Sequence, residues 1–371
     1  MTDIIVIGGG VAGISAAARL SHLGHVTLIE QEAATGYHAS GRSAALFEEN
    51  YGKPSTRALN AASRAFHETA NGGVLSPRGL MLLGSANDAE RYDADVLDMG
   101  LAEITTDEAR AMIPILSDKV NRAAYHAAAW DIDTALLMQN WLRELRGNGG
   151  TVMTRASVTA IARGADGWRV TVPQGDIKGK VLVNAAGAWA DVVAGLAGVK
   201  PLGLTPLRRS MARLAAPGGH DTRDWPMMFG PGEAWYAKPD AGALLVSPAE
   251  EHPSAPMDAY PVDMVLAEGL ARYQDFVTPE VTRPIATWAG LRSFAPDRQL
   301  VLGRAVDAPD FIWCAGQGGY GFQTSPAASQ LIADVVAERA PEIGAEWAAA
   351  LSPARFGQAT QAISSQLRRV T

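Results

Sequence analysis

A glycine-rich turn near the start of the chain has the residue spacing of a phosphate-binding loop. Gly8, Gly10 and Gly13 follow the apolar run 4–7 and precede a segment rich in Ala, Ser and Leu. Gly8 allows a sharp turn off a strand, Gly10 leaves room for a pyrophosphate, and Gly13 allows a helix to pack closely against the strand. The N–H groups and partial positive charge at the start of that helix favour a bound diphosphate.

An acidic residue follows this turn at the distance expected for ribose recognition. Glu30 lies 20 residues beyond Gly10, at the end of the apolar run 25–29. A carboxylate at the tip of a second strand accepts hydrogen bonds from ribose hydroxyls and repels a 2′-phosphate. A turn without a ligand is the alternative, but three glycines carry an entropic cost that a simple connection does not require. The turn alone does not distinguish NAD from FAD, although its N-terminal position favours FAD.

A second glycine-rich turn lies about 300 residues further along the chain. The apolar run 311–315 leads into the segment 316–321, and we expect a helix from Ala327 to Ala337. Two such turns suit a long, bent cofactor that the protein contacts at both ends, and FAD has that shape. The second helix N-terminus would stabilise negative charge at the N1–C2=O edge of a reduced flavin.

The elements that position these turns follow from the apolar runs around them. A helix and several buried strands are expected, the helix at 14–23 and the strands at 4–7, 25–29, 151–153, 156–161, 181–184 and 311–315. The run 168–172 alternates like a strand of a small sheet. The stretches from about 81 to 125 and from about 209 to 285 are richer in Pro, Trp and charge, with strand-like runs at 234–237 and 243–246. This pattern predicts an α/β fold, with a discontinuous Rossmann-like domain and a mixed-sheet α+β domain.

Composition excludes several classes of function. The 371 residues include 32 Lys and Arg against 39 Asp and Glu, and this net charge of −7 argues against a nucleic-acid partner. One cysteine, Cys314, and seven scattered histidines give no disulfide and no recognisable metal site. No apolar run approaches the ~20 residues that span a bilayer, and the first residues lack signal-peptide features. We expect a cytoplasmic protein, with peripheral contact to the inner membrane left open.

Motifs along nearly the whole chain resemble those of a known superfamily. They are Tyr236 and the runs 8–13, 36–38, 40–45, 51–52, 181–189, 198–209, 224–226, 238–242, 287–294, 317–321 and 323–325. Their order resembles the FAD-dependent amino-acid oxidoreductases of the D-amino-acid oxidase and glycine/sarcosine oxidase superfamily. The resemblance is greatest to bacterial D-amino-acid dehydrogenases of the D-arginine dehydrogenase type. It implies non-covalent FAD, because Cys314 lies within a strand and does not match the flavin-linked cysteine of some relatives.

The resemblance implies two domains and a set of cofactor contacts. The FAD-binding domain comprises residues 1–80, 140–208 and 286–371, and the substrate domain comprises 81–139 and 209–285. Arg42 and Ser43 are expected beside the diphosphate and ribitol, with an exposed surface loop as the alternative. The full set assigned to FAD is Gly8, Gly10, Val11, Ala12, Gly13, Glu30, Gln31, Arg42, Ser43, Ala44, Val158, Ala185, Ala186, Gly187, Trp189, Arg292, Gly318, Gly319, Tyr320, Gly321 and Gln323.

A second set of residues is expected to hold the substrate. Arg292 lies in an apolar run, where a charge is unusual without a partner. The carboxylate of an amino acid requires a bidentate guanidinium and a hydroxyl donor. The resemblance assigns this carboxylate clamp to Tyr51, Arg209, Tyr236 and Arg292, and the substrate or flavin edge to Gly319 and Gln323. Structural ion pairs are the alternative for the arginines, and a core position is the alternative for Tyr51.

Two departures from the resembled dehydrogenases concern the pocket for the substrate side chain. Those enzymes have a histidine at the position of Leu46 and an acid at the position of Leu80. An acid is the natural partner of a guanidinium or ammonium group, so Leu80 removes that partner. We assign Leu46, Phe47, Leu80 and Phe229 to an apolar pocket. We therefore expect weak activity on D-arginine and D-lysine and a preference for D-methionine, D-leucine or D-phenylalanine.

These features together predict an enzyme that deaminates D-amino acids oxidatively. Hydride transfer from the α-carbon to flavin N5 would give an imino acid, which hydrolyses to a 2-oxo acid and ammonia. The electrons would pass to a quinone or to oxygen. An oxidase of glycine, sarcosine or another secondary amine is the principal alternative. The second glycine turn disfavours an NAD-dependent dehydrogenase, and the clustered arginines and tyrosines disfavour a non-catalytic flavoprotein.

Overall fold

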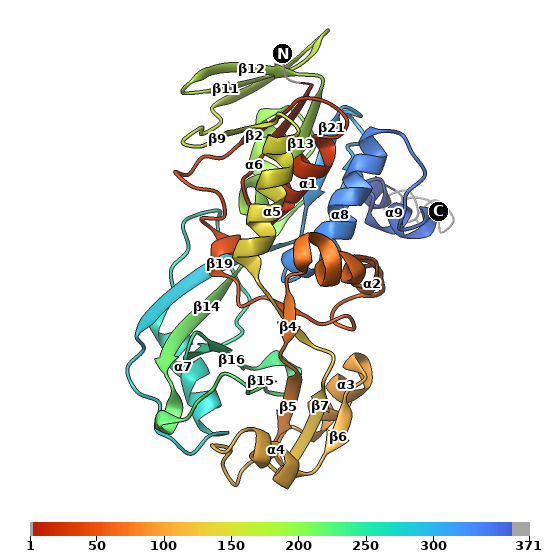
Figure 1. The fold of residues 1–371 in the computed structure, drawn as a ribbon. Coiled ribbons are helices and arrows are strands. Elements are labelled where there is room, and N and C mark those ends of the chain that lie inside the picture. The colour runs from red at the N-terminus through yellow and green to blue at the C-terminus, as the bar shows by residue number, and fades with distance from the viewer. Residues whose placement is uncertain (1–2, 358–371) are drawn as a thin grey trace, which may run out of the picture.

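Two unequal sheets form the two halves of the elongated molecule in Figure 1. The computed structural model describes residues 3–357. Within this range, the upper half of the picture contains a six-stranded sheet and the lower half contains a nine-stranded mixed sheet. The predicted fold class, a Rossmann-like α/β unit joined to a mixed-sheet α+β unit, is confirmed.

The six-stranded sheet is almost entirely parallel. Its spatial order is β20 (Val301–Arg304), β21 (Phe311–Ala315), β13 (Val181–Asn184), β1 (Ile4–Ile7), β2 (Val26–Ile29) and β9 (Thr151–Met153). The strands from β21 to β9 pair in parallel, and β20 runs antiparallel to β21. A parallel sheet of this kind needs cover on both faces, which explains why all four residues of β1 are apolar and buried.

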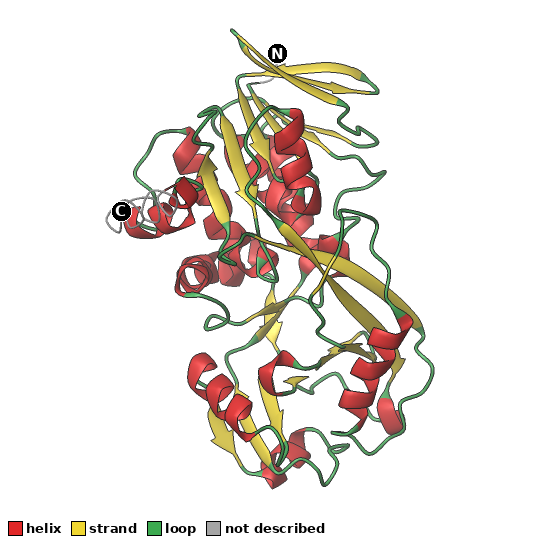
Figure 2. Cartoon of the chain, turned by 180° about the vertical axis from the view of Figure 1, so that it is seen from behind, coloured by secondary structure: helices red, strands yellow, loops and turns green. Residues whose placement is uncertain are grey.

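Alternate side chains of β1 enter two different hydrophobic cores. Ile4 and Val6 pack into the first core. Ile5 and Ile7 pack into the second core. The first core includes helices α1 (Val11–Leu20), α5 (Thr134–Gly147) and α8 (Gly321–Val336). The second is covered by α6 (Ala190–Leu196) and a small sheet of β10 (Ala160–Gly164), β11 (Gly167–Val172) and β12 (Gly175–Gly179). Figure 2 shows these layers from behind.

Three predicted boundaries in this half are wrong. Helix α1 occupies Val11–Leu20 rather than 14–23, and α8 begins at Gly321 rather than at Ala327. The expected strand 156–161 is irregular backbone as far as residue 159. The two helices begin earlier than predicted because a glycine of each motif, Gly13 or Gly321, lies in the first turn of its helix. Residues 156–158 line the cavity instead of pairing in a sheet.

The nine-stranded sheet forms the lower half. Its main order is β18 (His252–Pro253), β14 (Thr205–Ala215), β17 (Ala243–Ser247), β16 (Tyr236–Asp240), β15 (Met227–Phe229), β5 (Leu80–Gly84), β7 (Arg122–His126) and β6 (Ala102–Ile104). The ninth strand is β19 (Ala286–Phe294), which pairs with β14. Helices α3 (Ala89–Met99), α4 (Thr106–Met112) and α7 (Asp263–Gln274) pack around this sheet. The strand expected at 234–237 begins two residues later than predicted, at Tyr236.

Strands β14 and β19 join the two halves. They pair antiparallel over nine residues, from Thr205 opposite Phe294 to Arg213 opposite Ala286. Figure 2 shows them as long strands that cross the middle of the molecule. The predicted domain limits put residues 286–294 in the FAD-binding domain, whereas hydrogen bonding puts them in the lower sheet. The division into two domains otherwise stays a prediction.

A third, small sheet and a helix fill the space between the halves. The sheet has the order β3 (Leu46–Phe47), β8 (Trp130–Ile132) and β4 (Leu75–Pro77), and the helix is α2 (Pro54–Thr69), which packs against α8. Helix α9 (Ala345–Leu351) lies near the end of the described range. Within residues 3–357, no helix has both the length and the apolar character to cross a membrane.

Candidate active site

A single cavity takes lining residues from both glycine turns and from the lower sheet. The sequence-predicted residues that line it are Gly8, Gly10, Val11, Ala12, Glu30, Gln31, Arg42, Ser43, Ala44, Leu46, Tyr51, Leu80, Val158, Ala185, Ala186, Gly187, Trp189, Arg209, Phe229, Tyr236, Arg292, Gly318, Gly319, Gly321 and Gln323. Three predicted residues, Gly13, Phe47 and Tyr320, do not line it. The fold thus brings together residues that lie as much as 315 positions apart, between Gly8 and Gln323.

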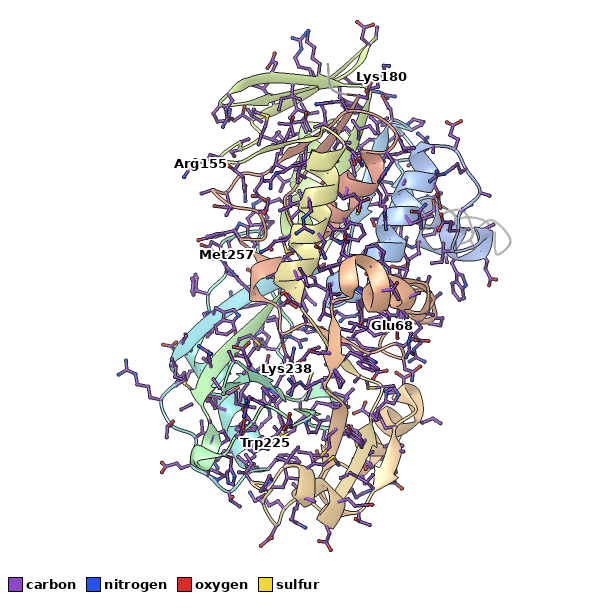
Figure 3. All side chains as sticks on the ribbon, viewed as in Figure 1. Glu68, Arg155, Lys180, Trp225, Lys238 and Met257 are labelled. Atoms are coloured by element: carbon purple, nitrogen blue, oxygen red, sulfur yellow. The ribbon has the colours of Figure 1, made fainter. Side chains whose placement is uncertain are left out.

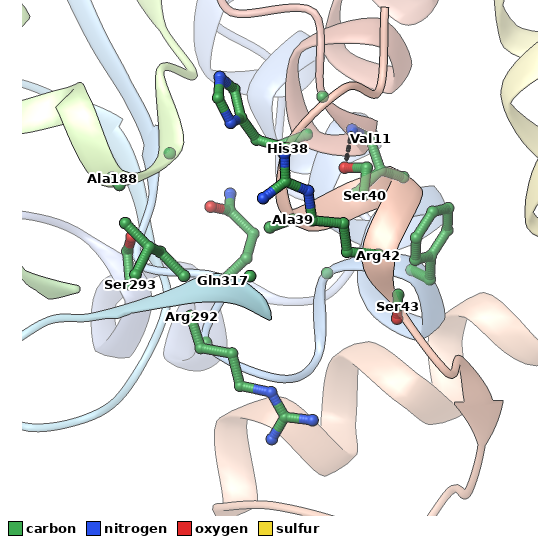
Figure 4. A pocket seen from close by; sticks show the side chains of 18 of the residues that line it. Val11, His38, Ala39, Ser40, Arg42, Ser43, Ala188, Arg292, Ser293 and Gln317 are labelled. Atoms are coloured by element: carbon green, nitrogen blue, oxygen red, sulfur yellow. Dashed lines mark hydrogen bonds between the residues drawn. The ribbon is translucent and has the colours of Figure 1, made fainter. Parts of the chain in front are cut away.

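The first glycine turn leaves no room for larger side chains. Gly8 has φ of +111°, and a Cβ there would lie 2.3 Å from the carbonyl oxygen of Ala185. A Cβ on Gly13 would lie 1.9 Å from the carbonyl oxygen of Gly8. Gly13 therefore acts behind the cavity, by allowing α1 to approach β1, as its place in the motif predicts. At the start of α1, the Val11 N–H donates to Ser40 Oγ at 2.9 Å (Figure 4).

Glu30 is fixed at the end of β2 by the backbone. Its Oε2 accepts from Gly9 N at 2.7 Å, and its Oε1 accepts from Glu32 N at 2.8 Å. The side chain is buried, yet the residue lines the cavity. A carboxylate held in this way keeps free lone pairs that a ribose hydroxyl can use. The turn and this acid therefore fit the adenosine diphosphate half of FAD.

Arg42 has a different environment from the predicted one. Its guanidinium donates to the carbonyl oxygens of Ala259 at 2.9 Å and Ala289 at 2.8 Å, and it pairs with Asp258 at 2.5 Å. In Figure 4, Arg42 and Arg292 lie on opposite sides of the β19 ribbon. Protein groups already occupy most of the Arg42 donors, although the residue lines the cavity. The predicted contact of Arg42 with a phosphate therefore stays a prediction.

Asp258 fastens a segment that we call the strap, residues 257–259, across the cavity. Met257 and Ala259 line the cavity, and Ala259 also packs with Ala188 of the opposite wall. Tyr37 adds a hydrogen bond to Asp258 at 3.2 Å. Met257 is labelled in Figure 3, where it lies between the two halves. The strap thus bridges walls that come from three separate stretches of the sequence.

The second glycine turn lies against the lower sheet. A Cβ on Gly318, which has φ of +53°, would lie 2.4 Å from the Phe294 ring. A Cβ on Gly319 would lie 2.8 Å from Arg292 Nη1. Tyr320 instead packs its ring against Tyr51, with centroids 5.1 Å apart, which explains why it faces away from the cavity. The turn therefore places a helix N-terminus beside Arg292.

Helix α8 starts unusually because Pro326 lies in its second turn. Pro326 cannot donate to the Phe322 carbonyl, and the Ser325 hydroxyl donates to it instead at 2.9 Å. The Gln323 carbonyl contacts His67 Nε2 at 3.0 Å. Burial lowers the pKa of His67 to about 4, so its ring is neutral at physiological pH. These contacts fix Gln323, whose side-chain Nε2 is buried without a hydrogen-bond partner among the described residues.

The substrate end of the cavity contains an unpaired cation. Arg292 is half-buried, lines the cavity, and makes no hydrogen bond or ion pair with any residue in the described range 3–357. Arg209, by contrast, donates to the Glu250 carbonyl at 3.0 Å and to Glu251 at 3.3 Å. Only Arg209 Nη1 lacks a described partner. The alternative of a structural ion pair thus applies in part to Arg209 but not to Arg292.

Two tyrosines adjoin this cation. The Tyr236 hydroxyl lies 3.3 Å from Met211 Sδ, which is a weak acceptor, and Tyr51 donates to Glu233 at 3.2 Å. Burial, and next the nearby Glu233, raise the pKa of Tyr51 well above its ordinary value. Tyr51 therefore stays protonated at neutral pH, and it can donate to a ligand in exchange for its hydrogen bond to Glu233.

Lys238, two residues beyond Tyr236 on β16, supports the cavity wall from below (Figure 3). Its Nζ donates to the carbonyl oxygens of Ala44 and Ala45 at 2.5 and 2.6 Å and pairs with Asp131 at 2.8 Å. Ala45 has φ of +36°, which is unfavourable for a residue with a side chain. Lys238 thus holds a strained part of the wall in place.

The chain matches the family model described as FAD dependent oxidoreductase over residues 3–335. It belongs to that family. Its cofactor is accordingly FAD, and the glycine turns, Glu30 and the helix N-termini are the groups that fit it.

Several relatives extend over most of the oxidoreductase. Glycine oxidase of Pseudomonas aeruginosa is 27% identical over 367 residues, which cover 92% of this chain and 96% of the relative. Glycerol 3-phosphate dehydrogenase of Caloramator mitchellensis is 24% identical and covers 92% and 75%. The crystal structure of L-proline dehydrogenase from P. horikoshii has a TM-score of 0.82 at 21% identity and covers 96% and 98%. Glycine oxidase from Geobacillus kaustophilus has a TM-score of 0.74 at 22% identity and covers 91% and 95%.

The single cysteine of the oxidoreductase is chemically inert in the fold. Cys314 is buried within β21, and burial raises the pKa of its thiol to about 12. A thiol at this pKa is protonated at neutral pH and is a poor nucleophile. This environment supports the expectation that the flavin is not linked through Cys314.

The side-chain pocket of the oxidoreductase differs from the prediction in two respects. Leu46, Leu80 and Phe229 line the cavity, but Phe47 points to the other face of β3, where it packs on His67 with ring centroids 5.5 Å apart. Alternation along the two-residue strand puts only one of these neighbours on the cavity side. The assignment of Phe47 to the pocket is therefore corrected.

The second difference is that the pocket is not wholly apolar. Glu48 and Glu233 line the cavity, together with Met99, Met211 and Met227. Sequence reasoning missed the two acids because they follow apolar or turn residues without a recognisable spacing. The run 44–47 followed by Glu48 was the one available signal, since an acid directly after an apolar strand is often placed at a strand end beside a ligand site.

Proposed function

We propose that this oxidoreductase oxidises the C–N bond of a D-amino acid with a neutral side chain, as a D-amino-acid dehydrogenase similar to the D-arginine dehydrogenase type. The observation that carries the proposal is Arg292. Its guanidinium lies in the cavity beside Gly319 with no described protein partner. A desolvated cation without a partner is costly, and a ligand carboxylate would compensate that cost.

The residues around Arg292 suit a carboxylate of this kind. Tyr236 and Tyr51 each present a hydroxyl near the guanidinium, and Arg209 offers one further free N–H. A planar guanidinium with hydroxyl donors around it matches the geometry of a carboxylate. A phosphate dianion, as in the glycerol 3-phosphate relative, would favour more than one unpaired cation, and Arg292 is the one without a partner in the described part of this cavity.

The protein's part in the reaction is mainly positioning. When bound, FAD supplies a hydride acceptor. Arg292 and the two tyrosines hold the substrate carboxylate, which fixes the α-carbon relative to the second glycine turn. Gln323 Nε2, buried and without a described partner, can donate to the substrate or to the flavin edge. The substrate reacts with its amine neutral, so no strong side-chain base is needed, and the imino acid hydrolyses in water to a 2-oxo acid and ammonia.

The preference for a neutral side chain rests on Leu46 and Leu80, which line the cavity. The D configuration and the quinone or oxygen acceptor rest on the family resemblance. Two relatives are named for the oxidation of glycine and of L-proline, which supports an amino-acid substrate. The non-covalent attachment of FAD rests on the buried Cys314 thiol.

Anaerobic reduction of the purified flavoprotein tests this function. The absorbance of the oxidised flavin would be followed with D- and L-amino acids, glycine, N-methyl amino acids and glycerol 3-phosphate. We expect bleaching by neutral D-amino acids and little by D-arginine. Bleaching by N-methyl substrates or glycine alone would favour the oxidase alternative, and bleaching by glycerol 3-phosphate or L-amino acids alone would contradict the proposal.

A further inference from the structure

A buried carboxylate lies at the substrate end of the cavity, and the proposed reaction does not use it. Glu48 is 2% exposed and lines the cavity. Its N–H donates to Gln323 Oε1 at 3.2 Å, and its carbonyl accepts from Tyr51 N at 3.2 Å. Glu48 is thus tied to two residues of the proposed substrate site.

The Glu48 carboxyl contacts the strand that pairs with the strand of Leu80. Its Oε2 lies 2.7 Å from His126 Nδ1, and its Oε1 accepts from Asn50 N at 3.0 Å. His126 on β7 is the register partner of Leu80 on β5. Opposite residues of an antiparallel pair stand on the same face, so His126 lies beside Leu80, which lines the cavity. The Glu48–His126 pair therefore lies beside Leu80, one of the residues assigned to the side-chain pocket.

The charged groups around the Glu48–His126 pair determine which substrate side chains this end of the pocket can bind. His126 is the one basic group in contact with the Glu48 carboxyl in the described range. The adjacent Glu49 points elsewhere, to Arg64 at 3.2 Å, and Glu233 accepts the Tyr51 hydroxyl. Burial raises the pKa of the Glu48 carboxyl, and the Asn50 N–H and His126 oppose that shift. In its ionised form, a carboxylate with two partners keeps lone pairs for a further hydrogen bond. This end of the pocket therefore suits a donor and repels an anion.

We propose that Glu48, backed by His126, determines specificity among neutral substrates by accepting a hydrogen bond from an amide N–H or a hydroxyl at the end of the side chain and by excluding acidic side chains. This inference rests on the proposed function and refines it. Leu46 and Leu80 contact an apolar stem, and Glu48 contacts its polar end. D-glutamine is then a better substrate than D-methionine, which has a similar length, and D-glutamate is the poorest of the three.

The test compares kcat/KM for these three D-amino acids in the flavin-loaded wild type, in Glu48→Gln and in a matched control. The control is Glu49→Gln, which removes the neighbouring carboxylate outside the cavity. In the wild type we expect D-glutamine to exceed D-methionine by about 10-fold, as for a hydrogen bond to a charged group. In Glu48→Gln, D-glutamate should gain about 10-fold relative to D-methionine, and D-glutamine should lose its advantage. The control should keep the wild-type ratios.

The possible outcomes distinguish a failure of this inference from a failure of the proposed function. If neutral D-amino acids reduce the wild-type flavin but Glu48→Gln changes all three substrates equally, the role of Glu48 is overturned and the function stands. If no D-amino acid reduces the wild type, both are overturned. If Glu48→Gln does not retain FAD, His126→Asn provides the second test, because it removes the imidazole that contacts Glu48 Oε2 and should reduce the advantage of D-glutamine over D-methionine. Unchanged ratios in that variant would overturn the inference.

Discussion

The polar groups at the two ends of the cavity differ in whether protein groups satisfy their hydrogen bonds. At the nucleotide end, the protein's own groups occupy one another: Arg42 pairs with Asp258 and with two carbonyls, and both Glu30 oxygens accept backbone N–H groups. At the substrate end, Arg292 and the Nε2 of Gln323 have no partner in the described range. At the nucleotide end, protein groups provide these hydrogen-bond partners. At the substrate end, a ligand would have to provide them.

This difference indicates how each ligand is recognised. The cofactor meets fixed backbone N–H groups and glycine turns that leave space for it, so its recognition is mainly a matter of shape and helix dipoles. The substrate meets a guanidinium that makes no ion pair or hydrogen bond within the described residues, so its recognition is mainly electrostatic. Substitutions at the nucleotide end should therefore reduce the retention of the cofactor. Substitutions at the substrate end should instead reduce kcat/KM.

The largest effect is expected from Gly13→Ala, which changes the packing of the helix at the nucleotide end. The new Cβ would lie 1.9 Å from the Gly8 carbonyl oxygen, so α1 would have to move away from β1. We expect loss of bound FAD and of soluble, folded protein, measured by the flavin-to-protein absorbance ratio and by thermal unfolding. Gly147→Ala is the matched control, because a Cβ there meets nothing within 4 Å. Normal flavin content in Gly13→Ala would contradict the packing role.

Arg292→Met attacks the charge at the substrate end. Truncating one partner of a buried charge pair costs about 2–5 kcal/mol, so kcat/KM should fall about 30-fold or more while FAD remains bound. Arg42→Met is the comparison at the other end. It should lower cofactor affinity and stability but leave kcat/KM of the loaded enzyme within a few-fold of the wild type. Similar kinetic losses in both variants would remove the distinction between the ends.

His67 makes the substrate end sensitive to acid. Burial lowers the pKa of His67 in the folded state from 6.5 to about 4, so the unfolded chain binds more protons between these values. Stability should therefore fall as the pH drops from 6.5 to about 4, by about 3 kcal/mol from this residue. His67→Gln should lose that part of the pH dependence in chemical denaturation. An identical pH profile in the variant would show that His67 is not its source.

The smallest effect is expected from Asp258→Asn, which loosens the strap. Arg42 and Tyr37 would lose their carboxylate, so FAD should dissociate several-fold faster while the loaded enzyme keeps its kcat/KM. The release of FAD into an excess of competing apoflavoprotein measures the rate. Asp221→Asn is the control, since Asp221 pairs locally with the exposed Arg223. Equal rates in both variants would show that the strap does not retain FAD.

The sequence predicted the nucleotide end better than the substrate end, for a physical reason. Gly8, Gly13 and Glu30 act through local geometry, and a motif of fixed spacing encodes that geometry directly. The protein partners of Arg42 could not be predicted, because Asp258 and Ala289 lie more than 200 residues away. No local pattern shows that a surface-like arginine is already occupied.

The substrate end depends on strands that meet only in the folded protein. Phe47 was assigned to the pocket because the alternation of a two-residue strand cannot be read without its partner β8. Glu48 was missed because its relation to the pocket depends on His126 and on the register of β5 with β7. Arg292 was recognised from its apolar setting and its resemblance to relatives, whereas its lack of a partner is a tertiary property.

The β14–β19 ladder limits how this molecule can open and close. Arg209 on β14 and Arg292 on β19 belong to the same nine-residue run of paired backbone, which continues from the lower sheet to the second glycine turn. A rotation of the lower half relative to the upper half could leave this pairing intact only if the chain bent outside the run. The two arginines would then move together, because backbone pairing sets the separation of the positions that carry them.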